Sequence, residues 1–304
     1  MTAAWVAGSV RAGAMARRRI GAAGARSLAQ SSSLDVALDR LAETAYGHDV
    51  KRSHTLAEAQ HAIGATLLWH FRVLAGWMPW QGTPVLRLLA GVFEILNVED
   101  MLRGDAGLRS LPPYELGALG TAWARLSAAS GDAELHAILN ASAWAPVGEG
   151  DRAVQVGMRM SLAERALGEL PLDWVLSAAA LLVAREHLLQ GQPLTGAVRR
   201  SAVTLLGREA VDAGALATFS SVLPPPASWV LDGVSDPAEL WRAEISWWRR
   251  LERDGFSLLR KGRFDPDPLL GAAAVLSVDA WRTRAALEIA ARGGTDQEAF
   301  DVVA

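Results

Sequence analysis

Apolar residues recur every three or four positions along almost the whole 304-residue chain, and this period is the strongest constraint on its fold. Stretches in which apolar and polar residues alternate, which are typical of strands, are scarce. The sequence therefore predicts an all-α protein. The expected helices cover residues 3–29, 33–45, 55–76, 83–103, 113–130, 132–141, 151–168, 171–190, 194–212, 214–222, 237–260, 266–292 and 295–303.

Several of these helices have recognisable first and last residues. Ser33 precedes one expected helix, and Thr55 stands three residues before Glu58 in the spacing of a capping box. Pro237 occupies a first helical position, where proline is favoured. Three apolar helices are followed by a glycine that we expect to end them in the left-handed conformation: Gly104, Gly191 and Gly293.

Composition and length exclude several classes of protein. Hydrophobic residues make up 51% of the chain and charged residues 21%, which is typical of a globular protein of two or three sub-domains. The absence of cysteine excludes disulfides and thiolate metal sites. A formal net charge of −3 gives no support to nucleic-acid binding, which usually needs a basic protein.

Neither a secretion signal nor a membrane-spanning helix is expected. Near the N-terminus the arginines follow a short apolar stretch, whereas a signal peptide has its charges before one. The most apolar candidate for a span, residues 63–80, contains His70 and Arg72 and is interrupted by Pro79. We interpret it as a buried helix.

Motifs of catalytic or metal-binding chemistry are weak. Glu58 and His61 form one Glu-x-x-His pair, but a di-iron bundle needs two such pairs. Asp265 and Asp267 alternate with prolines, which favours a turn before a helix over a cation site. The glycine-containing segment 148–153 follows no expected strand, so it does not predict a dinucleotide site. We expect no catalytic, cofactor-binding or metal-binding residue.

A short helix closed by an aromatic ring occurs three times in the sequence. The three rings belong to Tyr46, Trp144 and Trp229, and a long apolar helix that ends in glycine follows each of them. The ring would cover apolar area that the short helix cannot bury alone. We predict three helical repeats, over residues 1–105, 106–212 and 213–304. The alternative is that a helical chain rich in alanine and leucine produces such matches by chance.

Three stretches resemble a known family of V/A-type ATPase subunits, the family called C in prokaryotic enzymes and d in eukaryotic ones. Residues 34–46 resemble its L-x-x-L-x-x-T-x-Y motif, and an arginine-rich segment precedes them. Residues 93–104 are similar to its D/E-x-x-N-L-x-x-L-L-R helix, with Glu94, Asn97 and Arg103 at the matching positions. Residues 264–292 resemble its C-terminal end, although Asp279 stands where the family has a glutamate.

The resemblance implies a non-catalytic central-stalk subunit of a rotary ATPase. Such a subunit is a funnel-like body of three similar helical units, without a cofactor, on the cytoplasmic face of the membrane rotor ring. It links the rotor ring to the central axle and transmits torque in ion transport. The implied partners are the ring and axle subunits, which would hold it peripherally at the inner face of the cell membrane. Close-packed helices deform little, which suits that task.

The helix at residues 85–102 is apolar almost all round, and Glu94, Asn97 and Arg103 are polar exceptions in this segment and at its end. They either connect neighbouring helices or form the solvated strip of a surface helix.

A second set of residues is a candidate for contact with a partner. Arginines at 11, 18 and 19 share roughly one face of the first expected helix, and tryptophans at 77 and 80 lie in an expected loop. The alternative is a solvated face for the arginines and a place in the core for the tryptophans. The candidate contact residues are Arg11, Arg18, Arg19, Trp77 and Trp80.

Two functions of other classes remain open at this point. One is a helical adaptor that has the same fold and serves a different assembly. The other is a helical enzyme with an unfamiliar site, which predicts a closed pocket with several convergent titratable groups.

Overall fold

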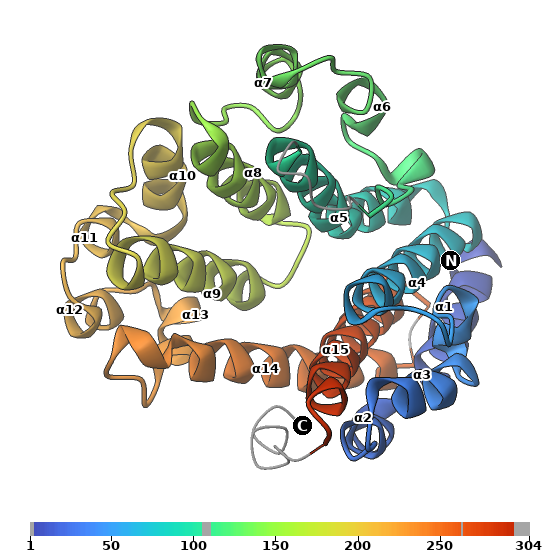
Figure 1. Cartoon of the computed structure of the whole chain (residues 1–304). Helices are drawn as coiled ribbons and strands as arrows, with labels where there is room; N and C mark the ends of the chain where they lie inside the picture. Colours follow the sequence, from blue (N-terminus) through green and yellow to red (C-terminus); the bar gives the residue numbers. More distant parts are fainter. Residues whose placement is uncertain (1–2, 105–110, 263, 295–304) are drawn as a thin grey trace. The chain divides into compact units, whose positions relative to one another are not determined.

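The computed structural model of the protein describes residues 3–104, 111–262 and 264–294 (Figure 1). Within these ranges the regular elements are all helices and no strand is present, which confirms the all-α prediction. The α-helices are α1 (Ala3–Arg17), α2 (Gly21–Ala29), α3 (Leu34–Ala42), α4 (Leu56–Trp77), α5 (Thr83–Arg103), α6 (Trp123–Leu126), α7 (Asp132–Asn140), α8 (Asp151–Ala166), α9 (Leu172–Val183), α10 (Gly196–Leu206), α11 (Arg208–Val211), α12 (Leu216–Ser221), α13 (Pro225–Ser228), α14 (Leu240–Arg260) and α15 (Pro266–Ala291).

Short turns of other helical types connect these elements. The 3₁₀ turns are η1 (Ala45–His48), η2 (Trp80–Gly82), η3 (Gly117–Leu119), η5 (Trp229–Leu231) and η6 (Pro237–Glu239). The segment η4 (Ala184–Leu189) is a π-helix that continues α9.

The chain forms two compact units. Unit 1 consists of residues 1–86 and 249–304, and unit 2 of residues 87–248. These bounds describe compactness; the division into repeats over 1–105, 106–212 and 213–304 stays a prediction.

Unit 1 is built around the last helix. The 26-residue α15 packs against α1, α2, α3 and α4, and Figure 1 shows it beside these helices. Its residues from Pro268 to Leu276 are all buried. The core that joins it to the N-terminal helices contains Leu38, Leu41, Ile63 and Leu287. Because α15 comes from the far end of the sequence, unit 1 closes only when both ends of the chain are in place.

Unit 2 has two apolar clusters. In the larger cluster, α8, α9 and α10 pack on one another, and α13 packs on α9. The smaller cluster joins α5 to α7 and the start of α8 through Ile95, Leu139 and the fully buried Trp144. This second cluster holds one of the two polar networks described below.

Most of the predicted helix ends agree with the structure. The Ser33 hydroxyl caps α3, and Thr55 and Glu58 form both halves of the capping box of α4. Gly191 and Gly293 are left-handed, with φ of +64° and +84°.

Gly104 does not adopt a positive φ, so that part of the prediction is wrong. Its N–H donates to the Met101 carbonyl (3.1 Å), and this tight turn ends α5 without a left-handed residue.

Two predicted helices are wrong for a common reason. The helix expected over 3–29 breaks into α1 and α2, and most of 113–130 is irregular apart from η3 and α6. At both places a side chain from another helix accepts backbone N–H groups that a continuous helix would use itself. The helix expected over 194–212 is also divided, because Gly207 has a φ of +87°. The helix expected over 295–303 lies outside the described residues.

Candidate functional site

A buried carboxylate in unit 2 accepts three N–H donors. Glu94 lies in α5 and has no exposed surface. Its Oε1 accepts from the Ala122 backbone N–H (2.7 Å) and from the Trp144 indole N–H (2.7 Å), and its Oε2 accepts from the Thr121 N–H (2.6 Å). The Arg165 guanidinium lies over the Trp144 ring, 4.8 Å from its centroid. Charge-assisted hydrogen bonds of this kind offset the cost of burying a carboxylate.

A second buried carboxylate occurs in unit 1, on α15. Oδ1 of Asp279 accepts from the Gly21 N–H (2.7 Å), and Oδ2 accepts from the Ile20 N–H (3.2 Å) and the Tyr46 hydroxyl (2.9 Å). Burial raises the pKa of Asp279 above its ordinary value, and the hydrogen bonds from Gly21, Tyr46 and Ile20 oppose that shift. Burial, followed by the nearby Asp279 charge, raises the pKa of Tyr46 well above its ordinary value.

The two networks share a local design. In unit 1 the Thr44 hydroxyl donates to the Leu41 carbonyl (2.7 Å) and accepts from the Tyr46 N–H (3.2 Å). In unit 2 the same two bonds run from Ser142 to the Leu139 carbonyl (2.7 Å) and from the Trp144 N–H to Ser142 (3.1 Å). In both, the turn after a short helix presents a ring whose polar hydrogen meets a carboxylate on a long helix. That carboxylate also receives two successive backbone N–H groups.

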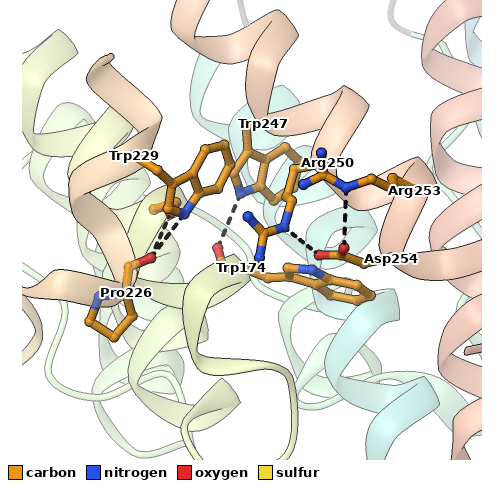
Figure 2. A network of polar contacts seen from close by, with 8 residues as sticks. Trp174, Pro226, Trp229, Trp247, Arg250, Arg253 and Asp254 are labelled. Carbon is orange, nitrogen blue, oxygen red and sulfur yellow. Dashed lines mark hydrogen bonds and ion pairs between the residues drawn. The ribbon is translucent and has the colours of Figure 1, made fainter. Parts of the chain in front are cut away.

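The third ring has different partners. The Trp229 indole N–H donates to the Pro226 carbonyl within its own turn (2.9 Å), as Figure 2 shows. The Ser177 hydroxyl of α9 reaches the same carbonyl at 3.5 Å. Nearby, the Trp247 indole N–H donates to the Trp174 carbonyl (3.1 Å; Figure 2). The Trp229 indole therefore donates to a backbone carbonyl, and Ala227 stands where the other two copies have the hydroxyl residues Thr44 and Ser142.

Asn97 and Arg103, which the sequence pattern grouped with Glu94, have separate roles. Asn97 is buried, and its amide accepts from the Tyr114 N–H (2.7 Å) and donates to the Tyr114 carbonyl (2.9 Å). Arg103 is exposed and pairs with Asp100 (2.8 Å) one turn earlier on α5. Glu94 and Asn97 thus hold the chain between residues 114 and 122, while Arg103 belongs to the solvated surface.

Sequence reasoning did not single out Asp279. It noted this residue only as a departure from a family pattern, yet the carboxylate occupies the same place in its network as Glu94 does in the other. The signal that could have identified it is a single charged residue within the otherwise apolar stretch 268–281.

The structure brings three of the five candidate contact residues together on unit 1. The Arg11 guanidinium lies 5.8 Å from the centre of the Trp77 ring, and Trp80 follows on η2. Trp77 is 50% exposed and Trp80 is 79% exposed.

The other two candidate contact residues are Arg18 and Arg19. Arg18 is exposed at the end of α1. Arg19 is directed inward instead: it donates to the Ala16 carbonyl (2.8 Å) and lies over the Phe256 ring at 4.5 Å.

Unit 2 contains an open pocket of about 350 Å³ at the start of α8. The charged groups that line it are Glu149, Asp151, Arg152 and Glu186. Arg152 is held by hydrogen bonds to Glu186 and Gln190, so its guanidinium is already engaged. Among the described residues, no group of three or more histidines and carboxylates is placed to hold a metal ion.

Comparison with known proteins adds no relative: no protein-family model matches the chain, and no curated protein matches it. In the part of the chain that the structure describes, no helix has the length and apolar character needed to cross a bilayer.

Proposed function

We propose that the chain is a non-catalytic subunit of a rotary V/A-type ATPase, which links the central axle to the membrane rotor ring at the inner, cytoplasmic face of the cell membrane. In this proposal three helical repeats form a funnel-like body that transmits torque during ion transport. The chain carries no catalytic site of its own and is held at the membrane by its protein partners.

The observation that carries this proposal is the pair of matching carboxylate networks. Each joins a short helix, a long helix and a backbone turn through one buried charge. Breaking any one contact would leave a buried charge with fewer partners, which is costly, so the helices resist displacement. A body that passes torque between two partners needs this resistance. The design appears at Tyr46 and Trp144, two of the three rings that define the predicted repeats.

The direct test is purification of the tagged full-length chain from the cells that express it, in mild detergent. We expect the rotor-ring and axle subunits of a V/A-type ATPase to elute with it in constant proportion. A matched pair of variants strengthens the test. Glu94→Gln alters a buried network, whereas Glu134→Gln alters an exposed contact with the Ser130 N–H. Only Glu94→Gln is expected to reduce the recovery of the partners.

A second candidate is a helical adaptor that has this fold and serves another assembly. The observation in its favour is the third ring: the Trp229 indole N–H donates to a backbone carbonyl of its own turn, so the third copy is built differently from the other two. The same purification separates the two candidates. An eluate that holds a different stoichiometric partner, and neither ring nor axle subunits, would support the adaptor and contradict the rotary subunit.

A further inference from the structure

The outer side of α1 is unusual for a solvated helix. Gly8 on this helix is so close to α4 that a Cβ atom there would collide with the Met78 side chain and lie 3.2 Å from the Trp77 carbonyl. Residues two positions before and after Gly8 point away from that contact because of the helical period. They are Val6 and Val10, which are 38% and 59% exposed. A solvated helix face normally carries charged residues.

Two exposed indoles lie beside this face. Trp77 ends α4 next to the Gly8 contact, and Arg11 of α1 lies over its ring. Trp80 is more exposed than any other large hydrophobic side chain among the described residues. Leaving two indoles and two valines in water at one end of a helix pair is unfavourable unless something covers them.

The chain segments that form this surface carry charge of one sign only. The first 34 residues contain five arginines and no acidic residue, although the whole chain has a formal net charge of −3. Residues 59–93, which include most of α4 and the two indoles, also contain no acidic residue. Protein interfaces commonly match charges of both signs across the contact. Arginines on segments that contain no carboxylate, together with exposed indoles, fit a surface of uniform negative charge that has an apolar interior beneath it.

We propose that this part of unit 1 binds directly to an anionic lipid membrane. The Trp–Arg surface consists of Val6, Val10, Arg11, Arg17, Trp77 and Trp80. Its indoles and valines enter the boundary between headgroups and acyl chains, and its arginines contact lipid phosphates. A lipid bilayer accepts exposed apolar side chains of any outline, whereas a protein partner would need a matching surface. The proposal concerns contact with lipid itself, so it is separate from any attachment through a rotor ring.

Sedimentation of the purified full-length chain with lipid vesicles tests this proposal. We expect the chain to sediment with vesicles of equal parts phosphatidylglycerol and phosphatidylcholine, and to stay in solution with phosphatidylcholine alone. Added salt should weaken the binding, because the phosphate contacts are exposed and therefore screened. The double variant Trp77→Ser/Trp80→Ser should bind about tenfold more weakly, equivalent to a loss of about 1.4 kcal/mol.

Trp241→Ser is the matched control. Trp241 is 46% exposed and has Arg242 over its ring at 5.2 Å, but it lies in unit 2 and Arg242 pairs with Glu239. This variant should bind the anionic vesicles as the wild type does. The single variant Trp80→Ser changes a largely solvated side chain, so it should not unfold the protein, and circular dichroism checks its helix content. A loss of binding in this variant therefore cannot be attributed to unfolding.

The proposal is overturned if the wild type does not sediment with the anionic vesicles, or if both vesicle types bind equally. It is also overturned if Trp241→Ser loses as much binding as the double variant. In those cases the exposed indoles serve a protein partner or none. Co-purification of ring and axle subunits measures protein partners and not lipid binding. The rotary assignment can therefore fail while lipid binding is observed, and lipid binding can be absent while the rotary assignment holds.

Discussion

Trp144 and Glu94, fifty residues apart in the sequence, are joined by a buried hydrogen bond of 2.7 Å between an indole N–H and a carboxylate. Tyr46 and Asp279 form the corresponding bond in unit 1, at 2.9 Å and across 233 residues. A hydroxyl fixes the ring in each case, and two backbone N–H groups share the carboxylate. The contact is therefore a repeated way of fastening a short helix to a long one, realised with different donor and acceptor residues.

Replacing Trp144 by phenylalanine should destabilise the protein by about 2–3 kcal/mol, because Glu94 loses a charge-assisted donor and the smaller ring leaves a gap. Urea unfolding followed by far-UV circular dichroism measures the change. Trp229→Phe is the control, since that indole is half-buried and donates to a backbone carbonyl, that of Pro226. Equal losses in the two variants would show that the carboxylate contact adds nothing specific.

Asp279 should make stability depend on pH with a particular sign. Burial raises its pKa in the folded protein above the ordinary value of 3.8. Just above that value the folded state still holds a proton that the unfolded chain has released. Stability therefore falls as pH rises through the interval between the two pKa values, and the effect is constant above it.

Asp279→Asn removes this titration. The quantity to measure is the free energy of unfolding of the wild type minus that of the variant, over a pH series from acid to neutral. We expect the difference to decline as pH rises from about 3.8 and then to level off. A difference that grows with pH would contradict this prediction. It would mean that the three hydrogen bonds lower the pKa of Asp279 by more than burial raises it.

His70 should act in the opposite direction. Burial lowers its pKa from 6.5 to about 4, with smaller effects from His48, Arg18 and Arg11, and Asp49 opposes the shift. As pH falls below 6.5, His70 becomes protonated in the unfolded chain but stays neutral in the folded protein. The free energy of unfolding therefore decreases as pH falls, down to about pH 4, where the folded protein is protonated as well. The full loss is about 3 kcal/mol.

His70→Gln should flatten this part of the stability profile in urea unfolding at a series of pH values. His136→Gln, which changes a half-buried histidine of α7, is the control for the effect of a histidine-to-glutamine substitution on stability. If the slope below pH 6.5 persists in His70→Gln, another group is responsible for it.

Gly271→Ala should destabilise unit 1 although alanine favours helices. A Cβ atom at this position in α15 would lie 2.6 Å from the Gly255 carbonyl oxygen and 2.9 Å from Leu259, both in α14. Separating the two helices should cost about 1–3 kcal/mol, more than the gain of about 1 kcal/mol in helix propensity. Thermal unfolding provides the measurement.

Gly76→Ala in α4 is the matched control, because a Cβ atom there would meet nothing within 4 Å. It should raise stability by about 0.5–1 kcal/mol. A stabilising effect of Gly271→Ala as well would show that the close approach of α14 and α15 is relaxed in solution.

Much of the fold follows from the sequence alone. Helical periodicity and the absence of strand patterns establish the all-α class, and the capping signals at Ser33 and Thr55 place two helix starts correctly. These features are local, because each depends on residues within one or two helical turns. They can therefore be predicted without knowing how the helices pack. The recurrence of a ring after a short helix, at Tyr46 and Trp144, is local in the same sense.

Only the tertiary structure decided where those rings bind. Asp279 interrupts the helix expected over 3–29, and Glu94 and Asn97 keep most of residues 113–130 irregular, because each side chain accepts distant backbone N–H groups. No local pattern encodes such a partner. A buried carboxylate needs several donors, and those donors come from whichever segments the packing of apolar faces brings near. The exposure of Trp77 and Trp80 is also a property of that packing, since the same residues read in sequence are equally compatible with a core.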